Sequence, residues 1–536
     1  MPKPFPSRLQ ALRLLPLLLL PGLLHAAAPK ADEDMARIVV AQHDTLIDLG
    51  KKLLARPANW PRLQKLNRIA DPLRLQPGST LLIPAALLKA EPLQARLESV
   101  SGSVQGSTGV LAAGALLAAD DSLTTGANSY AVVVLPDDSR YVVQPDSQIR
   151  VEQLQRLRGT NGQQSRVEIR QGRLENSVQP QRGPAARYEI RTPTALIGVR
   201  GTHFRAGYDG STARVEVTEG VVASNRDTRL NAGQGAVVDA AGTRTASLLA
   251  APVTTGIPAL FERPLIRLPL PETAGAAAHR VIVAGSAGFN LPLAEVLATG
   301  REARIAGLPD GDYRVRLRAV SAEGLEGQDA DAAFRLKARP EPPFASQPLP
   351  GGKVQGERVD FQWTEQPEAA RYRIQIAGAD GFARPLAQAE DLTGTRFSTS
   401  LPPGAYQWRV ASTRADGDRG PWSDAVPFTL KPLQGPPEPP AVGDDSVAFA
   451  WPAEPGQRFE FVMARDLAFA QIVQTLEPGE PKLVLPKPAA GEYFVRVRAT
   501  DPDGFVGQWS SPQRFVVEAS RPWWLIGVLP LLLLIH

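Results

Sequence analysis

Few side chains in this chain of 536 residues could perform catalysis. There is no cysteine, which excludes disulfides, thiolate nucleophiles and thiolate metal ligands. Beyond the N-terminal segment, the histidines are His43, His203, His279 and His536. They show no metal-ligand spacing, and no serine-elbow motif accompanies them. We therefore expect no enzymatic activity, no metal and no cofactor.

Paired carboxylates are the remaining candidates for acid–base chemistry. Asp137-Asp138 and Asp444-Asp445 lie among turn-forming residues, and turn preference alone accounts for aspartate there. Basic residues outnumber acidic residues by 59 to 55, a formal net charge of +4. Because this excess is small, we expect no nucleic-acid partner.

The first 26 residues have the pattern of a secretory signal peptide. Lys3, Arg8 and Arg13 form a positive segment before an apolar run over residues 14–24, and small residues follow it. An uncleaved membrane anchor is the alternative, but the run has about half of the roughly 20 residues that a spanning helix needs. We expect export to the periplasm or cell envelope.

The segment after the signal peptide shows a strand–helix–helix–strand pattern. An apolar strand at 38–41 is followed by Asp44 and Thr45, either of which can cap a first helix. A second helix opens at Trp60-Pro61, and residues 81–84 form a closing strand. The expected order of elements is βααβ.

Residues 36–86 resemble the LysM family. The matching residues are Asp44-Thr45-Leu46, Leu66-Asn67, Asp71-Pro72, Leu75-x-Pro77-Gly78 and Leu82-Ile83-Pro84. Two positions depart from the family pattern: His43 replaces a usual glycine, and Ile47 replaces a common aromatic residue. The resemblance implies binding of peptidoglycan, through glycan chains that contain N-acetylglucosamine.

The same resemblance implies a shallow groove between the loop after the first strand and the loop before the last. It would be lined by Asp44, Thr45, Leu46, Ile69, Asp71 and Pro72. Backbone groups in such loops can bond an acetamido group while Leu46 and Ile69 pack on its methyl. In the structural alternative, Asp44 is a helix cap and both apolar residues belong to the core. His43 would weaken the groove, because a side chain enters a positive-φ turn less easily than glycine.

Residues 93–245 change to alternating strand patterns separated by turns, which predicts one compact β domain. The stretch Arg191-Thr-Pro-Thr-Ala-Leu-Ile-Gly-Val-Arg-Gly-Thr-His-Phe204, followed by Leu230-x-Ala-Gly-Gln-Gly235, resembles the periplasmic domain of FecR-type proteins. The resemblance implies a relay between an outer-membrane receptor and a cytoplasmic sigma factor. Those regulators place an anti-sigma segment and a membrane span before this domain, whereas here a signal-peptide pattern and the LysM-like segment precede it. Sigma-factor regulation is therefore not expected.

Within the FecR motif, the candidate functional residues are Gly198, Arg200, Gly201 and Thr202. We favour a structural role for the two glycines, as a strand bend or bulge with close backbone approach, over contact with a partner. His203 is interpreted as a half-exposed strand residue.

Three segments repeat a turn, an aromatic residue and an alternating strand, at 265–338, 344–431 and 441–518. They resemble fibronectin type III sandwiches. The second and third have core tryptophans, Trp363 and Trp451, and the first is degenerate because it lacks them. Tyr313, Tyr406 and Tyr493 could form a carbohydrate platform, but a tyrosine at the corner of a sandwich explains the repetition better.

The C-terminal tail at 523–535 is apolar and opens with paired tryptophans. It would be roughly 20 Å long as a helix against a hydrocarbon core of about 30 Å. A shallow membrane anchor and an incomplete span both fit this pattern.

The expected fold class is multidomain and mainly β: a small βααβ LysM module, a β-rich FecR-like domain and tandem β-sandwiches. The favoured function is a cell-envelope scaffold that binds peptidoglycan and displays interaction domains to an unidentified envelope or membrane protein. A periplasmic sensory subunit that relays a signal to a membrane partner is the alternative. A peptidoglycan hydrolase is the least favoured.

Overall fold

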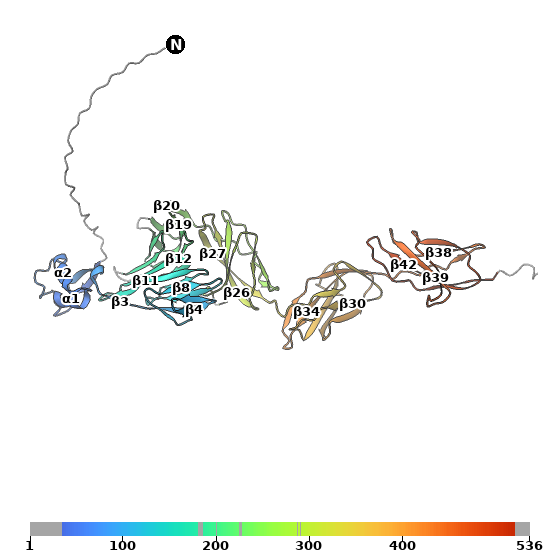
Figure 1. The fold of residues 1–536 in the computed structure, drawn as a ribbon, viewed down its shortest axis with the longest axis horizontal. Coiled ribbons are helices and arrows are strands. Elements are labelled where there is room, and N and C mark those ends of the chain that lie inside the picture. The colour runs from blue at the N-terminus through green and yellow to red at the C-terminus, as the bar shows by residue number, and fades with distance from the viewer. Residues whose placement is uncertain are drawn as a thin grey trace, which may run out of the picture. The chain divides into compact units, whose positions relative to one another are not determined.

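The computed structural model describes residues 35–180, 186–199, 201–224, 228–286, 288–289 and 291–519. The expected signal peptide, the C-terminal tail and Arg200 lie outside these residues. Two compact units are formed: the first holds the chain to residue 250 with 290–293 and 320–328, and the second holds the remainder. Both are built mainly from strands, and the α-helices of the described residues lie near the N-terminus (Figure 1). None of these helices is long and apolar enough to cross a membrane.

The N-terminal module begins the first unit. Its elements are β1 (Met35–Val39), α1 (Leu46–Leu53), η1 (Pro57–Asn59), α2 (Trp60–Leu66), β2 (Thr80–Pro84) and η2 (Ala85–Leu87). β1 pairs antiparallel with β2, with Met35 opposite Pro84 and Val39 opposite Thr80. The first strand was expected at 38–41, but β1 spans Met35–Val39; Val40 still bonds Gly78 and Ser79, and the chain turns after it, where the carboxylate of Asp44 accepts a hydrogen bond from the Ala41 N–H.

The core of this module is formed by apolar residues of both helices and both strands. It includes Leu46, Leu49, Leu53, Leu63, Leu81 and Ile83. Leu157, from the following domain, belongs to the same cluster. Gly159 also approaches the module so closely that an added Cβ would lie 2.7 Å from Leu53. The N-terminal module therefore packs against the domain that follows it.

The central β domain extends from β3 to β20. Its strands are β3 (Ala90–Pro92), β4 (Ala95–Ser101), β5 (Val104–Gly106), β6 (Gly109–Val110), β7 (Leu116–Leu117), β8 (Ser122–Thr125), β9 (Tyr130–Val134), β10 (Arg140–Val143), β11 (Gln148–Leu157), β12 (Gln163–Ser177), β13 (Arg187–Arg191), β14 (Leu196–Val199), β15 (His203–Tyr208), β16 (Ala213–Glu219), β17 (Val221–Ser224), β18 (Thr228–Asn231), β19 (Gln234–Asp239) and β20 (Gly242–Ser247).

The long strand β12 joins the two sheets of this domain. Its first half pairs antiparallel with β11 and parallel with β13. Its second half pairs antiparallel with β10 and β15 in the other sheet. Alternate residues from both sheets form one apolar core, in which Tyr141, Tyr188 and Phe204 are among the largest buried side chains.

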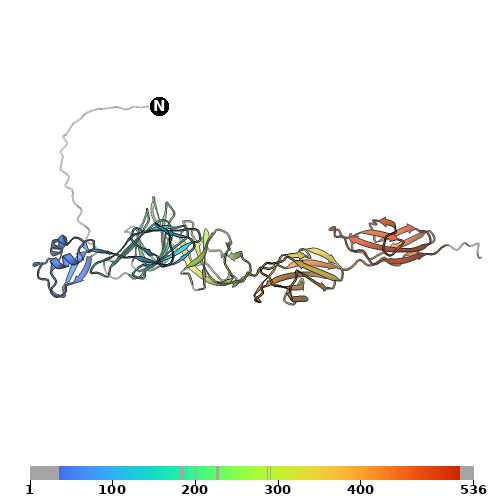
Figure 2. The same cartoon turned by 60° about the horizontal axis from the view of Figure 1, so that its bottom comes forward.

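Three two-layered sandwiches follow (Figure 2). The first contains β21 (Leu260–Phe261), β22 (Ile266–Pro269), β23 (Ala278–Gly285), β24 (Pro292–Ala298), β25 (Glu302–Ile305), β26 (Gly311–Val320) and β27 (Glu326–Leu336). The second contains β28 (Ala345–Gln347), β29 (Gly352–Gln355), β30 (Arg358–Trp363), β31 (Arg371–Gly378), β32 (Ala387–Leu392), β33 (Arg396–Ser400), β34 (Gly404–Thr413), β35 (Arg419–Trp422) and β36 (Val426–Lys431). The third contains β37 (Ala441–Val442), β38 (Ser446–Ala450), β39 (Arg458–Ala464), β40 (Ile472–Leu476), β41 (Lys482–Pro486), β42 (Gly491–Thr500) and β43 (Gln513–Val517).

The repeated tyrosines are corner residues of these sandwiches. The hydroxyls of Tyr313, Tyr406 and Tyr493 donate to the backbone carbonyls of Pro309, Pro402 and Ala489, each four residues upstream. All three rings are buried, so they cannot serve as an exposed carbohydrate platform. The corner interpretation is confirmed.

Candidate functional site

Backbone pairing brings the two predicted groove loops of the N-terminal module together. The Leu46 N–H donates to the Pro72 carbonyl at 2.8 Å, which joins the loop after β1 to the loop before β2. Asp44, Thr45, Ile69 and Asp71 therefore lie on loops that meet at this bond. These four residues are each at least partly open to solvent.

Several of these side chains also build the loops themselves. Thr45 caps α1: its hydroxyl accepts from the Asp48 N–H at 3.1 Å and donates to the Asp48 carboxylate at 2.8 Å. The Thr45 hydrogen bond is the main reason that the pKa of Asp48 lies below its usual range. Asp71 accepts from the Leu73 N–H at 2.9 Å, which closes a turn.

The predicted apolar contacts of the groove divide into one buried and one accessible residue. Leu46 is 0% exposed, so its side chain serves the core and has no surface to offer an acetamido methyl. Ile69 is only partly buried against that core. An apolar ligand group could therefore pack on Ile69, and the structural alternative holds for Leu46.

His43 occupies the turn that the sequence singled out. Its φ is +70°, which lies in the left-handed region that glycine enters most easily. The residue is exposed, so its side chain adds no burial that would offset this backbone cost. Asn67 has a clear structural role, because its side-chain amide bonds both the N–H and the carbonyl of Leu82 in β2, at 2.7 and 2.8 Å.

The FecR-like motif lies where β14 passes to β15. Gly201 has a φ of +86°, and an added Cβ would lie 2.8 Å from the Pro180 Cα. Thr202 is buried, and its methyl lies where a side chain at Gly220 would have to fit. These contacts support the structural role that was predicted for Gly201.

The prediction for Gly198 was wrong. An added Cβ there would meet no atom within 4 Å, and β14 pairs with β13 and β17 without a bulge. His203 starts β15 and its side chain is half exposed, as expected, with its Nε2 3.7 Å from a Glu219 carboxylate oxygen.

A buried ionic cluster in the first unit was not predicted. Arg205 on β15 faces Glu216 on β16, and both are about 95% buried, with exposed fractions of 5% and 4%. Arg205 donates to the carbonyls of Glu326 and Gly327 at 2.9 and 2.7 Å. Arg173 donates to the Glu326 carboxylate at 2.8 Å. The only sequence signal is a charged residue amid the apolar residues of β15.

These observations can be set beside known proteins. A family model described as FecR protein matches residues 121–223. The FecR resemblance is thus confirmed for that segment, which contains the motif at Gly198–Thr202. No curated protein matches the chain.

Several solved structures resemble parts of this chain. A putative anti-sigma factor from Parabacteroides distasonis is 16% identical over 25% of this chain and 71% of that chain, with a TM-score of 0.21. The chicken CNTN1 FN1–FN3 domains are 15% identical over 51% of this chain and 99% of that chain, with a TM-score of 0.20. The fibronectin(III)-like modules of Clostridium thermocellum CbhA are 12% identical over 33% and 93%, with a TM-score of 0.21.

Proposed function

We propose that this chain is an exported, non-enzymatic protein of the cell envelope that binds peptidoglycan through a LysM module at residues 36–86. The observation that carries the proposal is the Leu46–Pro72 hydrogen bond, which places the two loops of the expected groove side by side. Ile69 supplies an accessible apolar surface there. Backbone polar groups of the same loops can bond an N-acetyl group.

The FecR domain would then present an interaction surface close to the wall. Leu157 and Gly159, at the β11–β12 turn, pack against the N-terminal module. Glycan binding by that module would therefore hold the FecR domain near the wall. One such module gives modest affinity, which additional contacts by other domains would raise through effective concentration. The partner of the FecR domain would be a protein of the envelope or membrane.

Sedimentation with purified sacculi tests the wall-binding proposal. We expect the full chain to pellet with sacculi at low and moderate salt. The variants Ile69→Ala and Asp71→Asn should pellet less, whereas Leu116→Ala, which alters an exposed leucine of the central domain, should pellet like the parent. A parent chain that stays in the supernatant would refute wall binding. Equal pelleting of all variants would refute the site.

A sensory subunit is the second candidate, and the FecR match at residues 121–223 favours it. In that case the FecR domain would report a ligand to a membrane partner rather than display a fixed surface. Co-purification from solubilised membranes separates the two functions. A stable complex with a membrane signalling protein supports the sensor, and its absence from membranes that retain the chain supports the scaffold.

A further inference from the structure

The same loop recurs in all three sandwiches, directly after the strand that carries the corner tyrosine. It follows β26, β34 and β42, and each copy contains an acidic residue before a glycine: Glu323-Gly324, Asp416-Gly417 and Asp503-Gly504. The three glycines have φ values of +82°, +87° and +88°, so the turn has one shape. We call it the corner loop.

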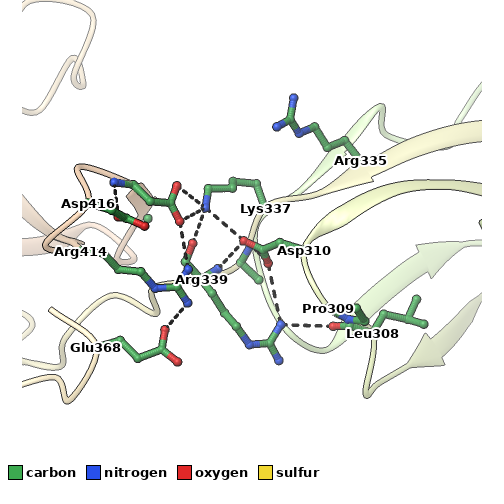
Figure 3. Close-up of polar contacts among 12 residues, drawn as sticks. Leu308, Pro309, Asp310, Arg335, Lys337, Arg339, Glu368, Arg414 and Asp416 are labelled. Carbon is green, nitrogen blue, oxygen red and sulfur yellow. Dashed lines mark hydrogen bonds and ion pairs between the residues drawn. The ribbon is translucent and has the colours of Figure 1, made fainter. Parts of the chain in front are cut away.

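The corner loop of the second sandwich contacts the end of the first (Figure 3). Lys337, just after β27, places its amino group 2.9 Å from the Asp418 carboxylate and 3.1 Å from Asp310 of its own sandwich. Asp310 also accepts from the N–H groups of Ala338 and Arg339, at 2.9 and 3.1 Å. The junction is therefore bonded from both sides.

The segment 339–343, which connects the first two sandwiches, takes part in this junction. The Ser412 hydroxyl donates to the Glu341 carbonyl at 2.7 Å. The Arg339 side chain returns to the Leu308 carbonyl at 3.2 Å. Backbone groups of the segment 339–343 are thus bound to both neighbouring sandwiches, which restricts the movement of this segment.

The corner loop of the third sandwich also contacts the second sandwich, but through the residue that opens the loop, Asp501, whereas Asp418 closes the loop of the second sandwich. Asp501, with 5% of its side chain exposed, accepts from Lys353 at 2.7 Å and from Lys431 at 2.9 Å. Lys431 also reaches Glu454 at 2.6 Å. Gln508 donates its side-chain amide to the Gln355 carbonyl at 3.1 Å. Two cations of one sandwich thus converge on one carboxylate of the next.

The receiving lysines occupy equivalent positions. Lys337 directly follows β27 and Lys431 is the last residue of β36, and each comes directly after a Phe-x-Leu sequence, at Phe334–Leu336 and Phe428–Leu430. The third sandwich ends its last strand with Phe515-Val-Val517, and the next residue is Glu518. Its end therefore carries the opposite charge and could not receive an acidic corner loop in the same way.

The corner loop of the first sandwich is engaged too, within the first compact unit. Arg214 donates to the Glu323 carbonyl at 2.8 Å. Gly324 lies so close that an added Cβ would be 2.7 Å from the Arg214 Nε. All three copies of the loop are thus occupied by partners.

We propose that the corner loop is a repeated docking element, which binds the terminal lysine of the preceding sandwich and holds successive sandwiches at defined orientations. The sandwiches of the second unit would then form a rigid spacer, in which neighbouring domains do not rotate freely relative to one another. Surface ion pairs alone would be weak, but these pairs are partly buried, share partners and lie beside backbone hydrogen bonds. Networks of this kind are screened less by salt than isolated surface pairs.

Distances between spin labels in the full chain test this proposal, and the absence of native cysteine makes labelling specific. One label pair at Ala383→Cys and Ala470→Cys reports the second joint, and another at Ala274→Cys and Ala383→Cys reports the first. We expect one narrow distance distribution for each pair. Lys431→Glu should broaden only the distribution between residues 383 and 470, because it replaces the cation beside Asp501 with a second carboxylate.

Matched variants keep the outcome interpretable. Lys482→Glu changes an exposed lysine whose acidic partner, Glu480, lies in the same sandwich, and it should leave both distributions narrow. Lys337→Glu should broaden only the distribution of the first joint, which gives an independent answer if Lys431→Glu prevents folding. Broad distributions in the parent chain, or narrow ones in both lysine variants, would overturn the proposal.

Discussion

The amino group of Lys431 lies 2.9 Å from the carboxylate of Asp501. Burial alone would raise the pKa of Asp501, but hydrogen bonds from Gln457, Lys353 and Lys431 lower it well below the usual range. A carboxyl whose pKa is lower in the folded state stabilises that state above its unfolded pKa, near 3.9, and loses this effect as the pH falls further.

We therefore expect Asp501→Asn to lower the melting temperature by the same amount at pH 7 and at pH 5. The difference from the parent should shrink only below about pH 4, the unfolded pKa of aspartate. Thermal unfolding from about pH 2.5 to about pH 7 measures this difference in melting temperature. Asp503→Asn, at a site where more than half of the side chain is exposed, should cost less throughout. A penalty that disappears between pH 7 and pH 5 would contradict the assignment.

The buried Arg205–Glu216 pair should be among the most sensitive sites in the first unit. Arg205→Met would leave Glu216 buried without its cross-strand cation and remove the donor to two carbonyls. Loss of one partner from a buried pair typically costs about 3–5 kcal/mol. Chemical denaturation should show this loss, and Arg187→Met, at an exposed position on β13, should stay within about 0.5 kcal/mol of the parent.

The two glycines of the FecR motif should respond differently to alanine. Gly201→Ala would place a Cβ at a φ of +86° and 2.8 Å from the Pro180 Cα, which costs at least about 1–2 kcal/mol. Gly198→Ala enters open space and should change the free energy of unfolding by less than about 0.5 kcal/mol. Equal losses in the two variants, measured by denaturant unfolding, would contradict this distinction.

The corner tyrosines should contribute stability through their hydroxyl groups. Tyr493→Phe removes the bond to the Ala489 carbonyl and should cost about 0.5–1.5 kcal/mol. Tyr141→Phe is the contrast, because that buried hydroxyl has no hydrogen-bond partner among the described residues. Its removal should be neutral or slightly stabilising, and melting curves of the two variants give the comparison.

The sequence predicted local features better than long-range ones. The Thr45 cap, the corner tyrosines and the core tryptophans Trp363 and Trp451 follow from short patterns whose partners lie within the same element or repeat. The role of Arg205 could not be predicted, because its partners at 326 and 327 are more than a hundred residues away. Gly198 was misjudged because the sequence does not show which of two nearby glycines takes positive φ.

The groove was predicted only in part, because the sequence does not show contacts between distant residues. Its loops follow from the strand–helix pattern, but the Leu46–Pro72 bond that joins them is a contact between distant backbone groups. The sequence also could not show that Leu46 is fully buried whereas Ile69 remains partly accessible. Periodicity places both residues on apolar faces and does not distinguish the centre of a core from its edge.

Replacing His43 links the stability of this loop to its proposed function. His43 holds a φ of +70°, and left-handed backbone costs a residue with a Cβ roughly 1–2 kcal/mol. His43→Gly removes that cost but also loosens the unfolded chain, so we expect a net gain of about 0.5–1 kcal/mol.

His43→Ala is the matched control, because it removes the imidazole and keeps the Cβ. It should therefore show no gain in the free energy of unfolding. Without the cost of a side chain at positive φ, the loop should keep the backbone of Thr45 and Asp71 in the binding conformation more of the time. His43→Gly should therefore also pellet with sacculi at a higher salt concentration than the parent. Equal behaviour of the glycine and alanine variants would show that the backbone of His43 does not limit either stability or binding.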